Sequence, residues 1–437
     1  MPRTAYIIIA LLLLGACDTW FGEQEAPRLP GKRISVLLHE KSLVPDPKAA
    51  QEEILLPPPS VNPDWPQAGG YANHAMHHTE VAADIRRAWR ADIGSGSDDS
   101  DRINASPITA QGRVFTMDAE TVVSAFDAEK GQHLWEVELT PDEEDDGHIG
   151  GGLAYDKGRV YVTTGFAEVV ALNAETGAVL WRQTLGGPMR APPTARGGRL
   201  FAVTITNKLY ALDASNGSTL WTHSGITETA SLLGGGSPAV DAGVVVVPYS
   251  SGELVALKVE TGRVLWTESL ARLRRTDVVS SLAHIRGRPV IDRGRVFAMG
   301  HGDQMVAIDL RSGQRIWEKE IGGLQSLWVA GNYLFTLTNN AELVSLARDD
   351  GRIFWVTQLP RFEDEEDRRD FIVWTGPLLA SDRLIVAGSE GTVLAVSPYS
   401  GDIMGKAEMP DRIIVDPIIA DRSIYFLADN ATLVAYR

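Results

Sequence analysis

The chain has 437 residues, of which 44% are apolar and 22% are charged, so its composition is that of a soluble globular protein and excludes a disordered one. Acidic side chains outnumber basic ones by 57 to 41, which gives a formal net charge of −16. This charge repels the phosphate backbone of nucleic acids, so we expect no nucleic-acid partner.

The N-terminus has the pattern of an export signal. Arg3 precedes an apolar run over residues 5–14, which is too short to span a bilayer, and the run ends in Leu14-Gly15-Ala16-Cys17. These four residues resemble the lipobox of bacterial lipoproteins, which implies cleavage before Cys17 and attachment of lipid to it. We therefore expect a signal peptide over residues 1–16. The alternative is an incidental cysteine, and because Cys17 is the only cysteine, no disulfide can form.

A proline-rich segment follows the cysteine. Many prolines lie between Pro27 and Pro66, including the run Pro57-Pro58-Pro59, and apolar residues show little periodicity there. Such a composition is typical of an extended linker. We therefore predict that residues 17–64 hold the lipidated cysteine and a tether, and that residues 65–437 form the folded domain.

One pattern recurs along that domain. A strand ends in a sequence such as Ala171-Leu172-Asn173-Ala174, a glycine follows at Gly177, and a second strand carries Leu180-Trp181. The glycine suits a hairpin turn that needs a left-handed backbone conformation. Tryptophans recur at intervals of about 40 to 50 residues, the length of one four-stranded propeller blade. In the seventh copy, after Gly401, Gly405 stands where the tryptophan is expected.

The number of copies predicts how the ring closes. Each copy has another strand upstream of its hairpin, and eight such strands are recognisable. The eighth copy ends at Tyr436, one strand short of a blade. Ala88-Trp89-Arg90 resembles Leu180-Trp181-Arg182 and supplies the missing strand. We therefore predict an all-β, eight-bladed β-propeller of four-stranded antiparallel blades, closed by pairing of its N- and C-terminal strands. One tryptophan per repeat indicates a packing anchor rather than a cofactor-stacking ring, and the anchors are Trp89, Trp135, Trp181, Trp221, Trp266, Trp317 and Trp355.

Other candidate sites are weak. His74, His77 and His78 suggest a metal cluster, but their Gly/Asn-rich surroundings favour a surface loop. The acidic runs Asp142–Asp146 and Glu363–Asp367 lack the alternating ligands of a calcium loop, so we interpret them as solvated loops. No catalytic motif is recognisable, and we predict no catalytic residues, no cofactor and no metal site.

The repeat and the segment Trp65–Gly70 are similar to those of quinoprotein dehydrogenases. This resemblance implies a pyrroloquinoline quinone cofactor beside a calcium site, a carboxylate base and commonly a disulfide of adjacent cysteines. With a single cysteine that disulfide is impossible, and the short repeats leave little room for insertions. A quinoprotein-type oxidoreductase is therefore the alternative hypothesis, and a propeller that binds a small ligand in its funnel is a third.

The lipobox, the tether and the propeller without catalytic motifs together resemble the BamB family of outer-membrane protein assembly factors, over nearly the whole chain. Residues Val306–Gln314 are especially similar to that family's repeat. The resemblance implies a non-catalytic lipoprotein scaffold of the β-barrel assembly (BAM) complex, anchored on the periplasmic face of the outer membrane. The implied partners are the POTRA domains of the barrel subunit BamA, other BAM lipoproteins and unfolded outer-membrane proteins. Asp18, which follows the lipidated cysteine, leaves the inner membrane open as a destination.

In that family, neighbouring inter-strand loops on one face of the ring contact BamA. By position these loops correspond to residues 230–236 and 276–288, and the predicted partner-binding residues are Leu232, Leu233, His284 and Arg286. The chemistry departs from the family pattern, because leucine and glycines replace Arg and Glu in the first loop, and His284 and Arg286 stand in place of carboxylates. We expect these two to offer hydrogen-bond donors to an acidic partner, and for the leucines packing beneath the loop is the alternative.

Overall fold

The computed structural model of the chain describes residues 43–141, 148–228, 232–271 and 284–437. Cys17 and Asp18, the signal peptide, and the acidic run Asp142–Asp146 lie outside the described residues. In the part of the chain that is described, no helix is long and apolar enough to cross a membrane.

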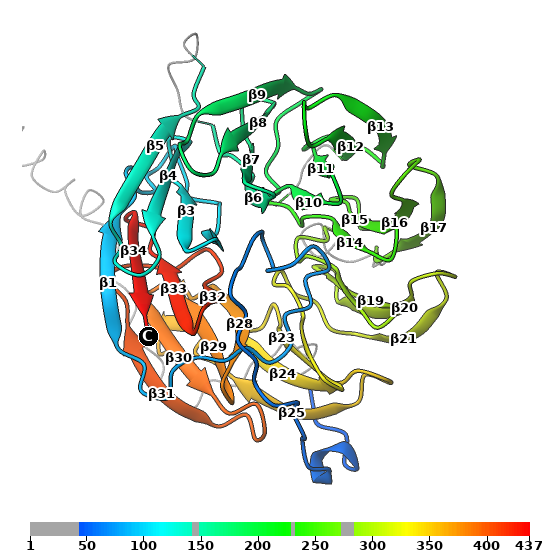
Figure 1. Ribbon diagram of the computed structural model, residues 1–437. Coiled ribbons are helices and arrows are strands. Elements are labelled where there is room, and N and C mark those ends of the chain that lie inside the picture. Colours follow the sequence, from blue (N-terminus) through cyan, green and yellow to red (C-terminus); the bar gives the residue numbers. More distant parts are fainter. Residues whose placement is uncertain (1–42, 142–147, 229–231, 272–283) are drawn as a thin grey trace, which may run out of the picture. The chain divides into compact units, whose positions relative to one another are not determined.

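Residues 44–437 form eight four-stranded antiparallel sheets arranged as blades around a ring (Figure 1). The predicted eight-bladed propeller is therefore confirmed. Besides the strands, the described residues contain one short 3₁₀ helix, η1 (Ala49–Gln51). Within a blade the chain runs from the innermost strand at the ring centre to the outermost strand at the rim.

The first four blades follow one another without interruption of this order. Blade 1 contains β2 (Ile108–Ala110), β3 (Arg113–Met117), β4 (Val122–Asp127) and β5 (His133–Glu138). Blade 2 contains β6 (Gly152–Asp156), β7 (Arg159–Thr163), β8 (Glu168–Asn173) and β9 (Val179–Thr184). Blade 3 contains β10 (Thr194–Arg196), β11 (Arg199–Val203), β12 (Lys208–Asp213) and β13 (Thr219–Ser224). Blade 4 contains β14 (Ala239–Asp241), β15 (Val244–Pro248), β16 (Glu253–Lys258) and β17 (Val264–Ser269).

The remaining blades include the one that closes the ring. Blade 5 contains β18 (Val290–Asp292), β19 (Arg295–Gly300), β20 (Gln304–Asp309) and β21 (Arg315–Lys319). Blade 6 contains β22 (Trp328–Ala330), β23 (Tyr333–Leu337), β24 (Glu342–Ala347) and β25 (Ile353–Gln358). Blade 7 contains β28 (Trp374–Ala380), β29 (Arg383–Gly388), β30 (Thr392–Val396) and β31 (Ile403–Glu408). Blade 8 contains β32 (Ile418–Ala420), β33 (Ser423–Leu427), β34 (Thr432–Tyr436) and β1 (Arg87–Asp92).

Blade 8 joins the two ends of the propeller. Its outermost strand, β1, pairs antiparallel with β34, and Trp89 lies opposite Ala435 in this pair. Beyond the strand ends, the backbone N–H groups of Arg86 and Arg437 each donate to the carbonyl of the other. The predicted closure by N- and C-terminal strands is confirmed, and it leaves no blade incomplete.

The tryptophans join each blade to the next. Trp135 on β5 of blade 1 packs against Gly177, the hairpin glycine of blade 2, where an added Cβ would lie 2.7 Å from the indole. Its Nε1–H donates to the carbonyl of Ala174 in the same hairpin, at 3.2 Å. The other six anchors make the same bond to the next hairpin, at Ala128, Ala214, Val259, Leu310, Arg348 and Pro398. The repeat therefore encodes contacts between blades as well as within them.

The contact between blades 7 and 8 lacks this anchor. Gly405 pairs with Ala395 in the register that elsewhere pairs a tryptophan with a small residue, such as Trp135 with Ala125. An apolar groove of about 230 Å³ lies there, with Ile85, Ile385, Val393, Ile424, Phe426 and Tyr436 among its lining residues. The space next to Gly405 is open, since an added Cβ would meet no atom within 4 Å.

Residues 60–81, which we name the clasp, cross the centre of the ring (blue in Figure 1) and contact all eight blades. Backbone hydrogen bonds join Trp65 to Thr109 in blade 1. Backbone N–H groups of blades 2, 4, 5, 7 and 8 donate, in that order, to the clasp carbonyls of residues 66, 72, 73, 79 and 62. Side chains complete the set, since Gln67 Oε1 accepts from Ala195 N in blade 3 and Trp328 Nε1 of blade 6 donates to His77 O. The clasp thus satisfies backbone groups of the short inner strands, which would otherwise face the channel unpaired.

The segment before the clasp also packs on the propeller. The sequence analysis assigned it to the tether, but Asp46 N donates to Ile353 O and Leu55 N donates to the hydroxyl of Tyr333, both in blade 6. Ala49 and Ile54 are buried in the core of this region. Residues 46–55 are therefore bound to the propeller rather than free of it.

Two of the three neighbouring histidines are structural, so the surface-loop interpretation is wrong for them. His74 is buried; its Nδ1–H donates to Pro289 O at 2.7 Å and its Nε2 accepts from Ser237 Oγ at 3.4 Å. His78 is buried as well and bonds to Pro57 O and Asp382 N. They were misjudged because polar surroundings in sequence do not show that the clasp lies inside the ring.

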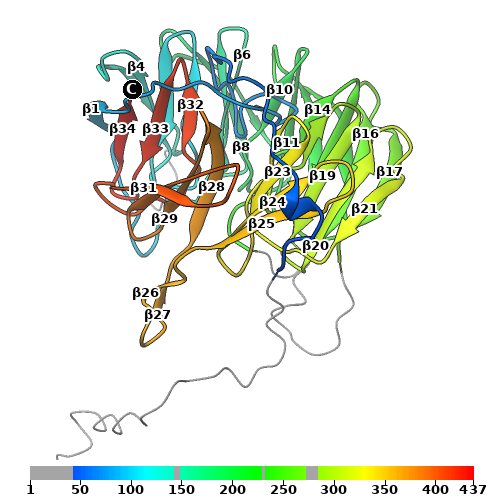
Figure 2. The ribbon, with the colours of Figure 1, turned by 90° about the horizontal axis from the view of Figure 1, so that it is seen from below.

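The second acidic run is also better ordered than a loop. Residues 363–367 lie in a two-stranded hairpin of β26 (Phe362–Asp364) and β27 (Arg369–Phe371), which projects from the ring between blades 6 and 7 (Figure 2). Phe362 and Phe371 pack edge to face at 5.7 Å. The carboxylates of residues 363–366 remain exposed, as expected of a solvated segment, and Asp367 is partly buried.

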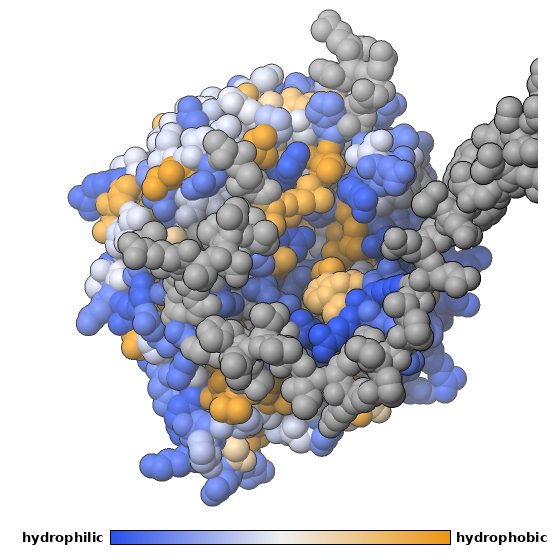
Figure 3. Space-filling model, turned by 180° about the vertical axis from the view of Figure 1, so that it is seen from behind, coloured by the Kyte–Doolittle hydropathy of each residue, from blue (hydrophilic) through white to orange (hydrophobic). Residues whose placement is uncertain are grey.

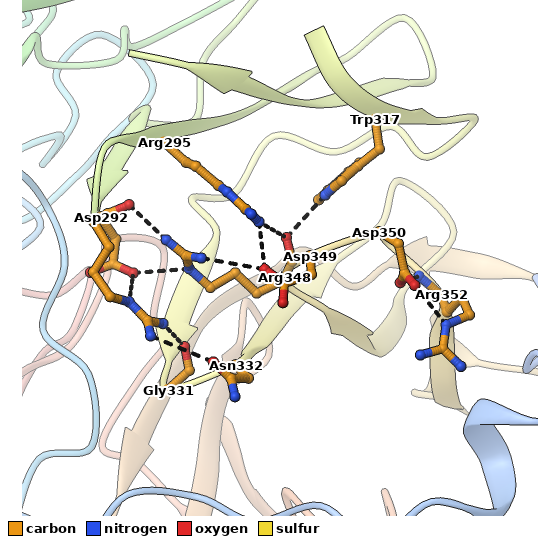
Figure 4. Close-up of polar contacts among 10 residues, drawn as sticks. Asp292, Arg295, Trp317, Gly331, Asn332, Arg348, Asp349, Asp350 and Arg352 are labelled. Atoms are coloured by element: carbon orange, nitrogen blue, oxygen red, sulfur yellow. Dashed lines mark hydrogen bonds and ion pairs between the residues drawn. The ribbon is translucent and has the colours of Figure 1, made fainter. Parts of the chain in front are cut away.

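A buried ion pair joins blades 5 and 6 (Figure 4). Arg348 occupies the hairpin position held by Ala174 in blade 2, and its Nε donates to Asp292 Oδ2 at 3.0 Å. Its Nη2 donates to the carbonyl of Asp292 at 2.9 Å, so most of the buried guanidinium is matched by acceptors. Such a pair contributes specificity of packing more than net stability.

Candidate partner-binding loops and central funnel

Residues 230–231 and 276–283 of the two predicted partner-binding loops lie outside the described residues, and the described parts lie side by side at the start of neighbouring blades. Residues 232–236 precede β14 of blade 4, and residues 284–288 precede β18 of blade 5. Leu232 N donates to His284 Nδ1 at 3.1 Å, and a Cβ on Gly236 would lie 3.0 Å from Gly287 O. The small residues of the first loop thus allow direct contact between the two backbones.

Leu233 reaches the surface of this loop pair. Its side chain is 43% exposed, whereas Leu232 is half-buried. The loop is held from below by bonds to its backbone, not by burial of Leu233. Of the two alternatives for the leucines, exposure fits Leu233 and packing fits Leu232 in part.

His284 does not present a charged donor at the surface, which corrects the sequence interpretation. It is buried, and burial together with the nearby charges of Arg286 and His301 lowers the pKa of His284 to about 4. It is therefore neutral at neutral pH and uses Nδ1 as an acceptor for Leu232 N–H. Its role in the loop pair is to position the backbone.

Arg286 also turns inward. Its Nε donates to Leu233 O at 3.0 Å, and its guanidinium lines a cavity at the centre of the ring. Burial lowers the pKa of Arg286, and the charge of Asp416 opposes this shift. An arginine stays protonated in spite of such a shift, so Arg286 carries a positive charge into the ring centre.

This cavity, which we name the funnel, is lined by segments that precede the inner strands of several blades. Its charged residues are Arg190, Arg286, Arg288 and Asp416, accompanied by Asn104, Ser106, Gln325 and Ser326. A second cavity that shares Arg288 and Asp416 is lined by Trp65, Gly69 and His74, so the clasp closes one end of the ring. The opposite face is hollowed near its centre (Figure 3).

Sequence reasoning missed Arg190, Arg288 and Asp416. The first and the last of them, Arg190 and Asp416, are 226 positions apart in the sequence, and only the closed ring brings them together. A usable signal existed: each lies two to four residues before an inner strand, the position that faces the centre in every blade. No group of three or more His, Cys, Asp or Glu side chains among the described residues is arranged to hold a metal ion.

Comparison with known proteins assigns the family. A family model described as "Outer membrane protein assembly factor BamB" matches residues 119–357, more than half of the chain. The chain belongs to the BamB family. The resemblance seen in the sequence is therefore confirmed for blades 1 to 6, which the matched residues span in whole or in part.

The chain is also similar to individual BamB proteins. BamB of Yersinia pestis is 26% identical over 253 residues, which cover 58% of this chain and 62% of that protein. The chain thus spans about three fifths of the length of this relative. The crystal structure of BamB from Moraxella catarrhalis superposes with a TM-score of 0.69 at 17% identity, covering 81% of this chain and 100% of that one.

The propeller fold itself is shared more widely than the BamB family. The quinohemoprotein alcohol dehydrogenase of Comamonas testosteroni superposes with a TM-score of 0.66 at 14% identity, covering 86% of this chain and 80% of that one. At this identity the likeness shows the fold alone.

Proposed function

We propose that this BamB-family chain is a non-catalytic scaffold lipoprotein of the BAM complex. In this role it binds the POTRA domains of a BamA-like barrel subunit, works beside the other BAM lipoproteins and assists the folding and insertion of outer-membrane proteins. Lipid on Cys17 anchors it to the periplasmic face of the outer membrane, with the inner membrane as the alternative that Asp18 suggests. Family membership supports the assembly role, and the braced loop pair with exposed Leu233 supports a protein partner.

The geometry of the loop pair favours binding over catalysis. Bonds from His284 and Arg286 fix the backbone on both sides of Leu232, so the loop loses little conformational freedom when a partner docks. Leu233 then offers a partly exposed apolar side chain on a fixed support, which is the character of an interface anchor. Arg286 and the neutral His284 contribute by holding this support through these two hydrogen bonds.

The test is Leu233→Asp, measured by co-purification with the barrel subunit and by a melting curve. Leu220→Asp is the matched control, because Leu220 is exposed to a similar degree, at 46%, but lies on outer strand β13. We expect Leu233→Asp to weaken binding by about 10- to 30-fold with little change in melting temperature, from the loss of one anchor. Undiminished binding refutes the loop as the contact, and an equal loss in the control refutes its specificity.

The anchor is tested separately by Cys17→Ser. Because the described residues contain no membrane-spanning helix, we expect this variant to fractionate as soluble protein with an unchanged melting temperature. Retention on membranes after a high-salt wash contradicts the lipid anchor. Addition of pyrroloquinoline quinone and calcium, followed by absorbance, separates the scaffold from a quinoprotein-type oxidoreductase, since a scaffold gives no bound-quinone spectrum.

A further inference from the structure

We propose that the funnel binds a small oxyanion carrying two or more negative charges, of the carboxylate or phosphate class, between Arg190 and Arg286. This site borders the loop pair proposed to contact the barrel subunit and shares Arg286 with it, but it binds a different class of ligand and goes beyond the scaffold function.

Positive charge converges on the funnel from two blades. Arg190 precedes β10 of blade 3, whereas Arg286 and Arg288 precede β18 of blade 5, and all three line one cavity. Asp416 is the only carboxylate among the lining residues that the structure describes. The lining groups thus carry three positive charges and one negative charge, although the whole chain has a formal charge of −16. Local charge opposite in sign to that of the chain indicates a site for an anion.

The single carboxylate is already occupied. Asp416 pairs with Arg288 through one oxygen and accepts from Gly376 N at 3.3 Å through the other. Among the described residues it makes no hydrogen bond to Arg190 or Arg286, although its charge acts on Arg286 from a distance. The Nε of Arg288 is buried and has no hydrogen-bond partner among the described residues, so even this arginine is incompletely matched.

The other two arginines retain unused donors. Arg286 uses Nε for Leu233 O, and for its Nη atoms no partner is found among residues 43–437 where these are described. The guanidinium of Arg190 likewise makes no hydrogen bond or ion pair within the described ranges, although the residue is partly buried. Partly buried donors without acceptors are costly, and a guanidinium fork fits a carboxylate or phosphate through two parallel bonds.

Arg348 shows what a purely structural arginine looks like in this chain. It is buried between blades 5 and 6, and its Nε and Nη2 are both bound by Asp292 (Figure 4). Among the described residues, by contrast, Arg190 has no bound carboxylate, and Asp416 is bonded to Arg288 and not to Arg286. The difference indicates that their counter-ion is supplied from outside the chain.

The shape of the funnel sets the size of the ligand. The funnel is a small cavity of about 50 Å³ that is open to solvent, and the clasp residues Gly69 and His74 close the end beyond Arg288. The side-chain amide of Asn104 donates to the carbonyls of Gly150 and Arg190, and that of Gln325 donates to the carbonyl of Trp374. The arginines are therefore the groups left to recognise a ligand. A small oxyanion therefore enters from the end of the cavity that the clasp does not close and is held at the guanidinium groups.

The experiment uses the full-length protein in detergent, titrated with citrate in one arm and phosphate in another, at constant ionic strength with chloride as the reference. We expect a saturable rise in melting temperature and a calorimetric binding isotherm with at least one of the two anions. Arg190→Gln is the decisive variant, because Arg190 makes no described side-chain contact and its loss should weaken binding at least 10-fold. Arg286→Gln should weaken binding as well.

Arg263→Gln is the control, since Arg263 is exposed in the hairpin between β16 and β17 of blade 4. This variant should bind as the unaltered protein does. Citrate binding alone assigns the carboxylate class, and phosphate binding alone assigns the phosphate class. Absence of saturable binding in both arms overturns the proposal, as does an equal response in the Arg190→Gln variant, which would show a general salt effect.

Discussion

Replacement of Gly405 by tryptophan should stabilise the propeller, because the groove between blades 7 and 8 lies where seven other blades place an indole. The backbone at Gly405 has ordinary strand geometry in β31, opposite Ala395, and an added Cβ meets open space. The groove of about 230 Å³ is lined mainly by apolar side chains. A tryptophan at this position therefore has both room and an apolar surface to bury.

The magnitude follows from area. A tryptophan that buries about 150 Å² gains roughly 4 kcal/mol at 25 cal/mol per Å². Ordering the side chain costs about 1 kcal/mol, and an indole N–H left without an acceptor at the seam costs about 1–2 kcal/mol. We therefore expect Gly405→Trp to raise the free energy of unfolding by about 1–2 kcal/mol.

The assay is urea denaturation followed by circular dichroism, with Gly405→Ser as the control. The serine variant shares the removal of a strand glycine, worth about 0.5–1 kcal/mol, but adds no indole. The reciprocal variant Trp355→Gly, which empties the equivalent slot between blades 6 and 7, should cost at least 3–5 kcal/mol. A tryptophan variant no more stable than the serine variant refutes the interpretation of the groove as a vacant anchor slot.

Three further predictions concern the ring centre and its closure. His74 has its pKa lowered from 6.5 to about 3, first by burial and then by Arg288, so below pH 6.5 the unfolded chain binds a proton that the folded chain excludes. The free energy of unfolding should therefore fall by up to about 1.4 kcal/mol per pH unit as the pH decreases from 6.5 towards 3. In denaturation experiments across this range, His74→Gln should reduce that slope. Asp292→Ala should destabilise the protein by about 3–5 kcal/mol because it leaves Arg348 buried without its counter-ion. The double variant with Arg348→Ala should regain part of this loss. A double variant whose destabilisation equals the sum of the two single variants would contradict the coupling. A chain beginning at Gly94 should melt far below one beginning at Val61, because it lacks β1 and nearly the whole clasp, and equal melting temperatures would show that neither closes the ring.

The propeller was predictable because its information is local and repeated. Each copy contains its own alternating strands, its turn glycine and its tryptophan, and the missing outer strand after Tyr436 has its counterpart at Trp89. The clasp was not predictable, since its contacts run through backbone groups and through side chains such as His74 and Gln67 with no periodicity. The packing of Ile54 on blade 6 escaped for the same reason.

The candidate site was predictable in place more than in chemistry. The position of the loops in the repeat locates Leu233 and Arg286 on neighbouring blades, and the structure brings them together. Whether a histidine donates to a partner or accepts within the chain depends on burial, which a single sequence does not show for His284. Arg190 drew no attention because its significance depends on charges nearly 100 residues away in blade 5.

The clasp also bears on how this family can change its repeat number. Repeat arrays gain or lose units readily when each unit contacts only its neighbours. Here the clasp, a segment of fixed length, has a bonding position for each of the eight blades. Trp65, for example, bonds to blade 1, and Asn62 bonds to blade 8. A duplicated or deleted blade would leave a clasp group or an inner strand without its partner, so the blade count is fixed by a ruler that lies outside the repeats themselves.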